Sequence, residues 1–187
     1  MIPHSAIVPH PLSFPAFTLR YGFTLIEIMI AMLAATILLA IGAPSMRAFI
    51  VETRMSIYVN QFVAAATLAR TEAIKRGRSA VICRSVNAES GPALCISGAS
   101  EGRPGNDWGS GWIVMVPGEK VVLLRQAALH PYTSVIGQNK VIRYDGLGRP
   151  GGSFTKLVLR HEGEFERVIC LSRSGRMNVH VGTSECG

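Results

Sequence analysis

Charged residues are scarce in this 187-residue chain, at 17% of the total, and one long segment has none. No charged side chain occurs from Ile28 to Met46. Residues 1–21 contain no acidic residue but have four prolines, a composition that does not favour folded structure. The uncharged segment instead predicts a helix that leaves water for an apolar environment.

Motifs for catalysis and metal binding are also missing. The segment Gly146-Leu-Gly-Arg-Pro-Gly151 satisfies G-x-G-x-x-G literally, but Pro150 and a following strand-like segment deny it the required helix. His161-Glu162 lacks the second histidine of a metalloprotease motif. No C-x-x-C pair exists and the histidines do not cluster near the cysteines, which disfavours zinc. We expect no enzymatic activity, no metal and no cofactor.

The charge that is present is mostly positive. Nineteen lysines and arginines against 12 aspartates and glutamates give a formal net charge of +7. This excess favours acidic partners, such as nucleic acid, anionic lipid or an acidic protein face, without choosing among them.

The order of segments at the N-terminus is the most specific signal. In an ordinary secretory signal the cleavage site follows the apolar region. Here a polar segment and Gly22 precede the apolar run, so cleavage after Gly22 would leave the hydrophobic helix in the mature chain. Gly22-Phe-Thr-Leu-Ile-Glu27, with a lone carboxylate at the fifth position after the glycine, resembles the type IV prepilin signature.

The resemblance implies processing and assembly roles for three residues. A prepilin peptidase would cut between Gly22 and Phe23 and methylate the new terminal amine of Phe23. Glu27 would then pair with the terminal amine of a neighbouring subunit during assembly. Alternatively, Glu27 lies in the first helical turn near the lipid headgroups, where the helix dipole favours an anion.

The span from Phe23 to Ala43 is about 30 Å of helix, enough to cross a bilayer core. Flanking charge does not orient it, because Arg20 lies on one side and Arg47 and Arg54 on the other. The resemblance places the leader in the cytoplasm and the C-terminal head outside it. Pro44 predicts a kink or local melting, with the helix continuing beyond it as in many pilins.

Beyond Pro44 the pattern becomes amphipathic and predicts helix to about Arg76, with Gly77 near its end. The later apolar positions are alanines, so a flat sheet could approach the helix closely. The predicted buried face consists of Val51, Met55, Val59, Phe62, Ala66, Ala69 and Ala73.

After Gly77 short β-rich runs alternate with turn residues. Together with the helix they predict an α+β fold: a long N-terminal helix, transmembrane in its first half and amphipathic in its second, packed on a small antiparallel β-sheet head. The expected strands are Ala80–Cys83, Trp112–Val116, Val121–Leu124, Val141–Tyr144, Phe154–Leu159, Arg167–Leu171 and Met177–Val181.

Three further segments resemble the GspH/FimT family of minor pilins and pseudopilins: Leu68–Gly77 at the helix end, Val81-Ile-Cys-Arg84, and Asp107-Trp-Gly-Ser-Gly-Trp-Ile-Val114. We expect a leader at 1–22, a transmembrane and filament-core helix at 23–50, and a periplasmic head at 51–187.

Trp108 and Trp112 are interpreted as packing residues around a glycine-rich turn.

Four cysteines in an exported chain favour disulfides. Four cysteines allow three pairings, and the local one is the most economical: Cys83 with Cys95 and Cys170 with Cys186. The second loop encloses 15 residues and would stabilise the head by roughly 3 kcal/mol.

Basic residues near the C-terminus raise the possibility of DNA binding. Some FimT-type pilins bind DNA through arginines of a C-terminal G-R-x-R motif. This chain has Gly175-Arg-Met-Asn178, which keeps the first arginine, Arg176, and loses the second. Arg173 could replace it only if a hairpin brings it to the same face. The alternative is a solvated basic face or a contact with an acidic pilin neighbour.

Three functions therefore remain open: a structural minor pilin of a type IV pilus, a type II secretion pseudopilin, and a DNA-binding minor pilin used in natural transformation. All three imply the same partners, a prepilin peptidase and other pilins or pseudopilins that contact the N-terminal helix. All three also imply a single-pass inner-membrane protein, with its head in the periplasm, that later enters a pilus or pseudopilus.

Overall fold

The computed structural model describes residues 22–86, 88–89, 92, 94–100, 102–151, 155–182 and 185–186. The predicted leader, apart from Gly22, lies outside these residues. The chain divides into two structural units between Pro44 and Ser45. The predicted boundaries at 22/23 and 50/51 stay predictions.

Helix α1 runs from Leu25 to Arg76 and continues through Pro44, as predicted. It ends at Gly77, whose φ of 59° is left-handed. The Arg78 N–H donates to the Ala73 carbonyl and the Gly77 N–H to the Ile74 carbonyl. This is a Schellman cap, in which glycine takes the conformation that side chains disfavour.

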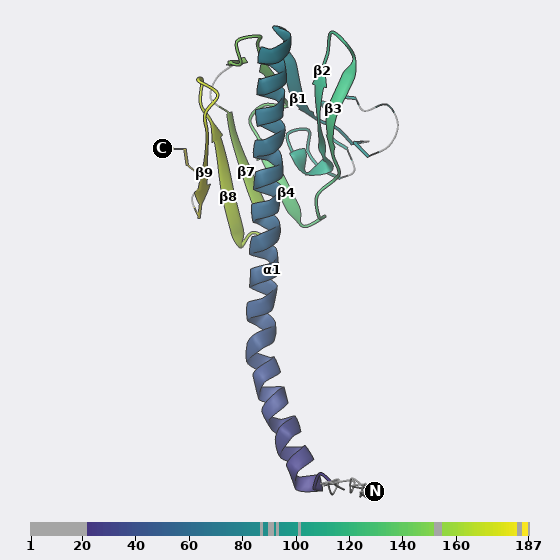
Figure 1. The fold of residues 1–187 in the computed structure, drawn as a ribbon, viewed down its shortest axis with the longest axis vertical. Coiled ribbons are helices and arrows are strands. Elements are labelled where there is room, and N and C mark those ends of the chain that lie inside the picture. The colour runs from purple at the N-terminus through teal and green to yellow at the C-terminus, as the bar shows by residue number, and fades with distance from the viewer. Residues whose placement is uncertain are drawn as a thin grey trace, which may run out of the picture. The chain divides into compact units, whose positions relative to one another are not determined.

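The head contains two antiparallel sheets rather than a single one. The first has the order β3-β2-β1-β5-β6 and the second the order β4-β7-β8-β9. Figure 1 shows β1, β2 and β3 on one side of α1 and β7, β8 and β9 on the other. The strands are β1 (Ala80–Arg84), β2 (Trp112–Val116), β3 (Val121–Gln126), β4 (Thr133–Gly137), β5 (Val141–Tyr144), β6 (Pro150–Gly151), β7 (Thr155–His161), β8 (Phe165–Leu171) and β9 (Met177–Val181).

The amphipathic half of α1 packs on both sheets through one core. Its buried residues are the predicted stripe, with Ala65 added and Val51 only half-buried. Phe62 lies edge-on to two tryptophans, with ring centroids 5.6 Å from Trp108 and 5.4 Å from Trp112. The alanines are fully buried, which lets the sheets approach the helix backbone closely.

The α+β fold class is confirmed, and the predicted strands occur with small shifts at their ends. Phe154, where one strand was expected to start, lies outside the described residues, and β7 starts at Thr155. The sequence reading missed β4, β6 and the short 3-10 helix η1 (Trp108–Ser110). In the literal G-x-G-x-x-G segment, residues 146–149 form the β5–β6 turn and Pro150–Gly151 form β6. The next described element is strand β7 rather than the helix that the motif requires, as expected.

Candidate functional site

The first turn of α1 is organised by Thr24 and Glu27. The Glu27 N–H donates to the Thr24 hydroxyl at 3.3 Å and to the Thr24 carbonyl at 3.1 Å. Thr24 therefore caps the helix, and Thr24-x-x-Glu27 has the spacing of a capping box. The sequence reading missed this role, although the T-x-x-E pattern signals it.

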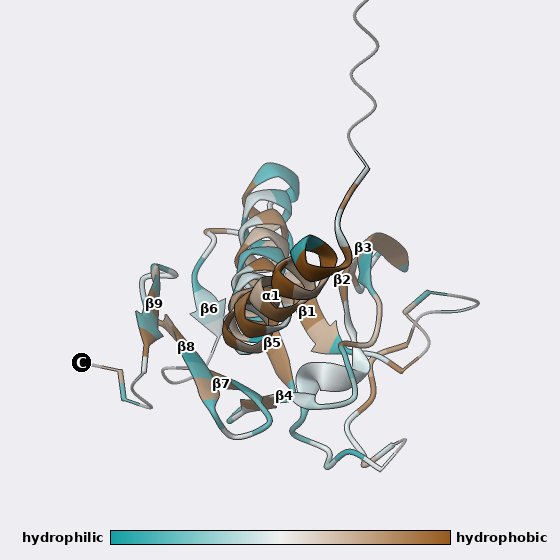
Figure 2. Cartoon of the chain, turned by 90° about the horizontal axis from the view of Figure 1, so that it is seen from below, coloured by the Kyte–Doolittle hydropathy of each residue, from teal (hydrophilic) through white to brown (hydrophobic). Residues whose placement is uncertain are grey.

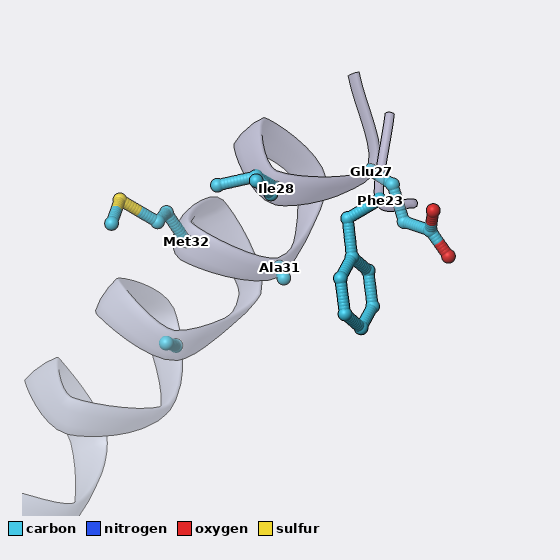
Figure 3. A pocket seen from close by; sticks show the side chains of 6 residues that line it. Phe23, Glu27, Ile28, Ala31 and Met32 are labelled. Carbon is cyan, nitrogen blue, oxygen red and sulfur yellow. The ribbon is translucent and has the colours of Figure 1, made fainter. Parts of the chain in front are cut away.

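The Glu27 carboxylate is exposed, and within the described chain it has no hydrogen-bond or ion-pair partner. Figure 3 shows the carboxylate beside the ring of Phe23, with the side chains of Ile28, Ala31 and Met32 following along the helix. Phe23 is 80% exposed. The apolar ring of Phe23 and the unpaired carboxylate of Glu27 thus lie together at the start of the helix, where another molecule can contact both.

The remainder of this helical half is apolar and exposed. Every residue from Gly22 to Ile50 is exposed in the isolated chain. One 18-residue window of α1 reaches a mean hydropathy of 2.5, so by length and composition the helix could cross a membrane. Figure 2 shows this part of α1 in brown, the colour of hydrophobic residues. Such a surface requires lipid or other apolar helices around it.

Both predicted local disulfides are present. Cys83 is joined to Cys95 and Cys170 to Cys186, with Cα–Cα distances of 5.5 and 5.8 Å. The first bridge holds the segment that follows β1, and the second holds the C-terminal end against β8. Each bridge therefore fixes a segment that belongs to neither sheet.

Asp107 is the polar centre of the glycine-rich segment, a role that the sequence reading did not assign. One carboxylate oxygen accepts the N–H groups of Gly109 and Val135, both at 2.8 Å. The other pairs with Arg103 at 2.8 Å. The Asp107-Trp-Gly-Ser-Gly-Trp segment thus joins η1 to β4 and buries Trp108, consistent with the predicted packing role of the tryptophans.

Arg84, next to Cys83 of the first disulfide, likewise holds a loop through several hydrogen bonds. It is fully buried, and its guanidinium donates to the hydroxyls of Ser110 and Ser100 and to the carbonyls of Gly98 and Gly105. The loop between β1 and η1 is therefore held at several points, although its described residues form little regular structure.

The β8–β9 turn carries Arg173 and Arg176, both exposed. Beside it the half-buried Arg70 donates to the Gly175 carbonyl at 3.2 Å. A Cβ on Gly175 would lie 3.3 Å from the Gly148 carbonyl oxygen, so the β5–β6 turn is adjacent as well. The structure thus brings the predicted C-terminal arginines next to the basic end of α1.

Several cations at this end already have partners. Arg76 bonds Glu72 at 2.7 Å and also pairs with Glu119. The Arg76 hydrogen bond lowers the pKa of Glu72, and Glu72 raises that of Arg76. Arg149 pairs with Asp145, whose pKa is lowered chiefly by the backbone N–H of Arg149. Arg173 and Arg176 have no ion pair within the described chain.

Comparison with known families decides the identity. The profile described as type II transport protein GspH matches residues 58–175. The chain belongs to the GspH family. A second profile, the prokaryotic N-terminal methylation motif, matches residues 17–43 of this GspH-family protein. No curated protein matches it.

Among solved structures, the GspH-family protein is similar to the type IV minor pilin FimU of Pseudomonas aeruginosa. In one crystal form the TM-score is 0.52 at 14% identity, covering 73% of this chain and 98% of FimU. A second crystal form gives a TM-score of 0.44 at 14% identity, covering 67% and 94%. The first match establishes a shared fold.

Together the two profiles make the GspH-family protein a minor pilin or pseudopilin, with a structural role in a type IV pilus or pseudopilus. The methylation motif implies processing by a prepilin peptidase and assembly with other such subunits. Its apolar N-terminal helix fits membrane anchoring before assembly.

Proposed function

We propose that the protein is a minor pilin that helps initiate or assemble a type IV pilus. The observation that carries the proposal is the apolar half of α1, exposed along its length and opening on an unpaired Glu27. A charged group at the start of an apolar helix is costly unless it has a partner. In a bundle of such helices, the terminal amine of a neighbouring subunit would supply that partner.

Processing would create that amine. The leader 1–22 would be removed between Gly22 and Phe23, and the amine of Phe23 methylated. The helix at 23–50 would sit in the inner membrane and later in the filament core, with the head 51–187 in the periplasm. Mass spectrometry of the membrane fraction should find a mature chain that begins with N-methylated Phe23. An intact leader in wild-type cells would contradict the proposal.

The role of Glu27 is tested by Glu27→Leu. Membrane insertion should persist because the span becomes more apolar, whereas incorporation into filaments or minor-pilin complexes should fall. The matched control is Thr36→Leu, which removes another polar side chain from the same helix. The Thr36 hydroxyl already donates to the Leu33 carbonyl at 2.8 Å, so its loss should not affect assembly. Equal incorporation of the two variants would show that the Glu27 carboxylate has no role in assembly.

A type II secretion pseudopilin is the second candidate, supported by the description of the matching family as a type II transport protein. The two systems are separated by deleting the gene and scoring piliation and protein secretion in parallel. Loss of piliation with normal secretion supports the pilus, and the reverse supports the pseudopilus.

DNA binding is a third candidate, supported by the position of Arg173 and Arg176 beside the basic end of α1. Replacing both with alanine should weaken duplex binding and flatten the slope of log affinity against log salt by up to about two units. The control, Lys140→Ala with Lys156→Ala, removes equal charge elsewhere. Equal losses from both pairs would indicate diffuse attraction rather than a site.

A further inference from the structure

Sheet edges expose unpaired backbone groups, and proteins usually protect them with proline, charge, bulges, short strands or covering loops. The two sheets have four edge strands, β3, β6, β4 and β9. The first sheet is protected at both ends. Strand β3 carries Arg125 and has an irregular register with β2, and β6 is two residues long and contains Pro150.

In the second sheet, β4 is covered by the loop before η1. Asp107 forms an isolated bridge with Ile136, and the Gly137 N–H donates to the Asn106 carbonyl at 3.0 Å. Strand β9 differs from the other three. Its sequence, Met177-Asn-Val-His-Val181, has no proline and no lysine, arginine, aspartate or glutamate, and no other described strand pairs with its outer side.

The hydrogen-bond pattern shows which backbone groups of β9 face outward. Residues in an antiparallel ladder alternate between bonding to the neighbouring strand and pointing away from it. The Gly182 N–H donates to Glu166, and the Arg176 carbonyl accepts from Ser172, so even-numbered residues of β9 bond to β8. The N–H and C=O groups of Met177, Val179 and Val181 therefore face outward.

The same odd-numbered residues carry the apolar side chains. Met177 packs against the core, but Val179 is 43% exposed and Val181 64% exposed. They border a groove of about 240 Å³ between α1 and the second sheet. The groove is lined by Ser56, Val59, Asn60, Arg167, Val179 and Val181.

We infer that this outer edge of β9, together with the groove, binds an extended segment of a neighbouring pilin-like subunit, which joins the second sheet as an additional strand. The inference rests on the proposed role as a filament subunit. An added strand pairs with outward N–H and C=O groups and inserts alternate side chains into pockets. The outward N–H and C=O groups belong to Met177, Val179 and Val181, and two of these residues, Val179 and Val181, also line the groove.

The size of the groove favours this occupant. Small-molecule sites typically have about 300–1,000 Å³. The groove, at about 240 Å³, is smaller than such a site. It accommodates a few aliphatic side chains projecting from a strand whose backbone is bonded to β9. The incoming segment should therefore have apolar residues at alternate positions.

Hydrogen exchange of the full chain tests the inference directly. The amides of Val179 and Val181 should exchange about tenfold more slowly, or slower still, in assembled filaments than in the unassembled protein in detergent. Equal exchange in the two states would overturn it. A photo-cross-linker at position 181 should reach an extended segment of a different subunit. Cross-links only to β9 of a second copy, or only to a helix, would also overturn it.

A matched pair of variants tests the surface by assembly. Val179→Lys places a charge on the groove face, whereas Asn178→Lys places the same charge on the opposite face of the same strand. Both positions are exposed, so both variants should fold. Incorporation should fall at least severalfold for Val179→Lys and stay unchanged for Asn178→Lys. If Glu27→Leu blocks assembly but Val179→Lys does not, the filament role stands and the β9 inference fails.

Discussion

Replacing Phe62 with alanine should weaken the packing of α1 on the head more than almost any other single truncation. Phe62 is 2% exposed and contacts both tryptophans edge-on. Truncating a buried phenylalanine typically costs about 3–5 kcal/mol, because transfer free energy is lost and a cavity remains. Small domains are stable by only about 5–15 kcal/mol, so the variant would be marginally folded.

Urea unfolding of the full chain in detergent, followed by tryptophan fluorescence, measures this loss. Trp108 and Trp112 are the only tryptophans, so the signal reports on the site that Phe62 contacts. With an m-value of about 2 kcal/mol per molar urea, the midpoint should fall by about 1.5–2.5 M.

The control is Phe49→Ala, the same substitution on the same helix at a side chain that is 66% exposed. Its free energy of unfolding should change by no more than about 0.5 kcal/mol. Equal midpoints for the two variants would refute the view that this aromatic contact anchors α1 to the sheets.

Three further predictions concern the head. Replacing Cys170 and Cys186 together with alanine should lower the free energy of unfolding by about 3 kcal/mol, measured by the same urea titration. Burial raises the pKa of Tyr144 from 10.0 to about 12, so the folded state keeps its proton where the unfolded state loses it. The contribution of Tyr144 to stability should be constant below about pH 10 and fall by about 2–3 kcal/mol between pH 10 and 12. Tyr144→Phe should abolish that fall and be nearly neutral at pH 7, because the buried hydroxyl has no hydrogen-bond partner among the described residues. Gly148→Ala should lower the thermal midpoint by several degrees, since φ is +74° and the new Cβ would lie 2.5 Å from Ile74, whereas Gly118→Ala meets nothing within 4 Å and should be neutral.

Local patterns predicted much of the architecture. The apolar run, the stripe of α1 and the Gly77 stop depend on residues close in sequence, and the helix ends where they indicated. Most strands also followed from β-branched runs. Strand β4 (Thr133-Ser-Val-Ile-Gly137) was missed, although it is as long as β9, which was predicted. It is held by contacts from a distant segment, including the Asp107 bond to the Val135 N–H.

The candidate sites divide in the same way. The Gly22–Glu27 segment could be found from sequence because its residues are consecutive and their order is unusual. Local spacing also favoured the cysteine pairing that the structure contains. The position of Arg173 and Arg176 beside α1 could not be predicted from local spacing. It depends on the hydrogen bond from Arg70 to Gly175, which lies in the same turn but 105 positions later in the chain.

By itself, the sequence determined the prepilin-like N-terminal segment, the long helix and its buried face. Helical periodicity and a cleavage motif both depend on residues that are close together in the chain. Only the tertiary structure decided the division into two sheets and the gathering of basic residues at the end of α1. It also decided that β9 is an edge strand, with no strand paired to its outer side among the described residues. These features arise from pairing between strands far apart in the chain, where hydrogen bonds and side-chain packing select one arrangement among many that the local pattern permits.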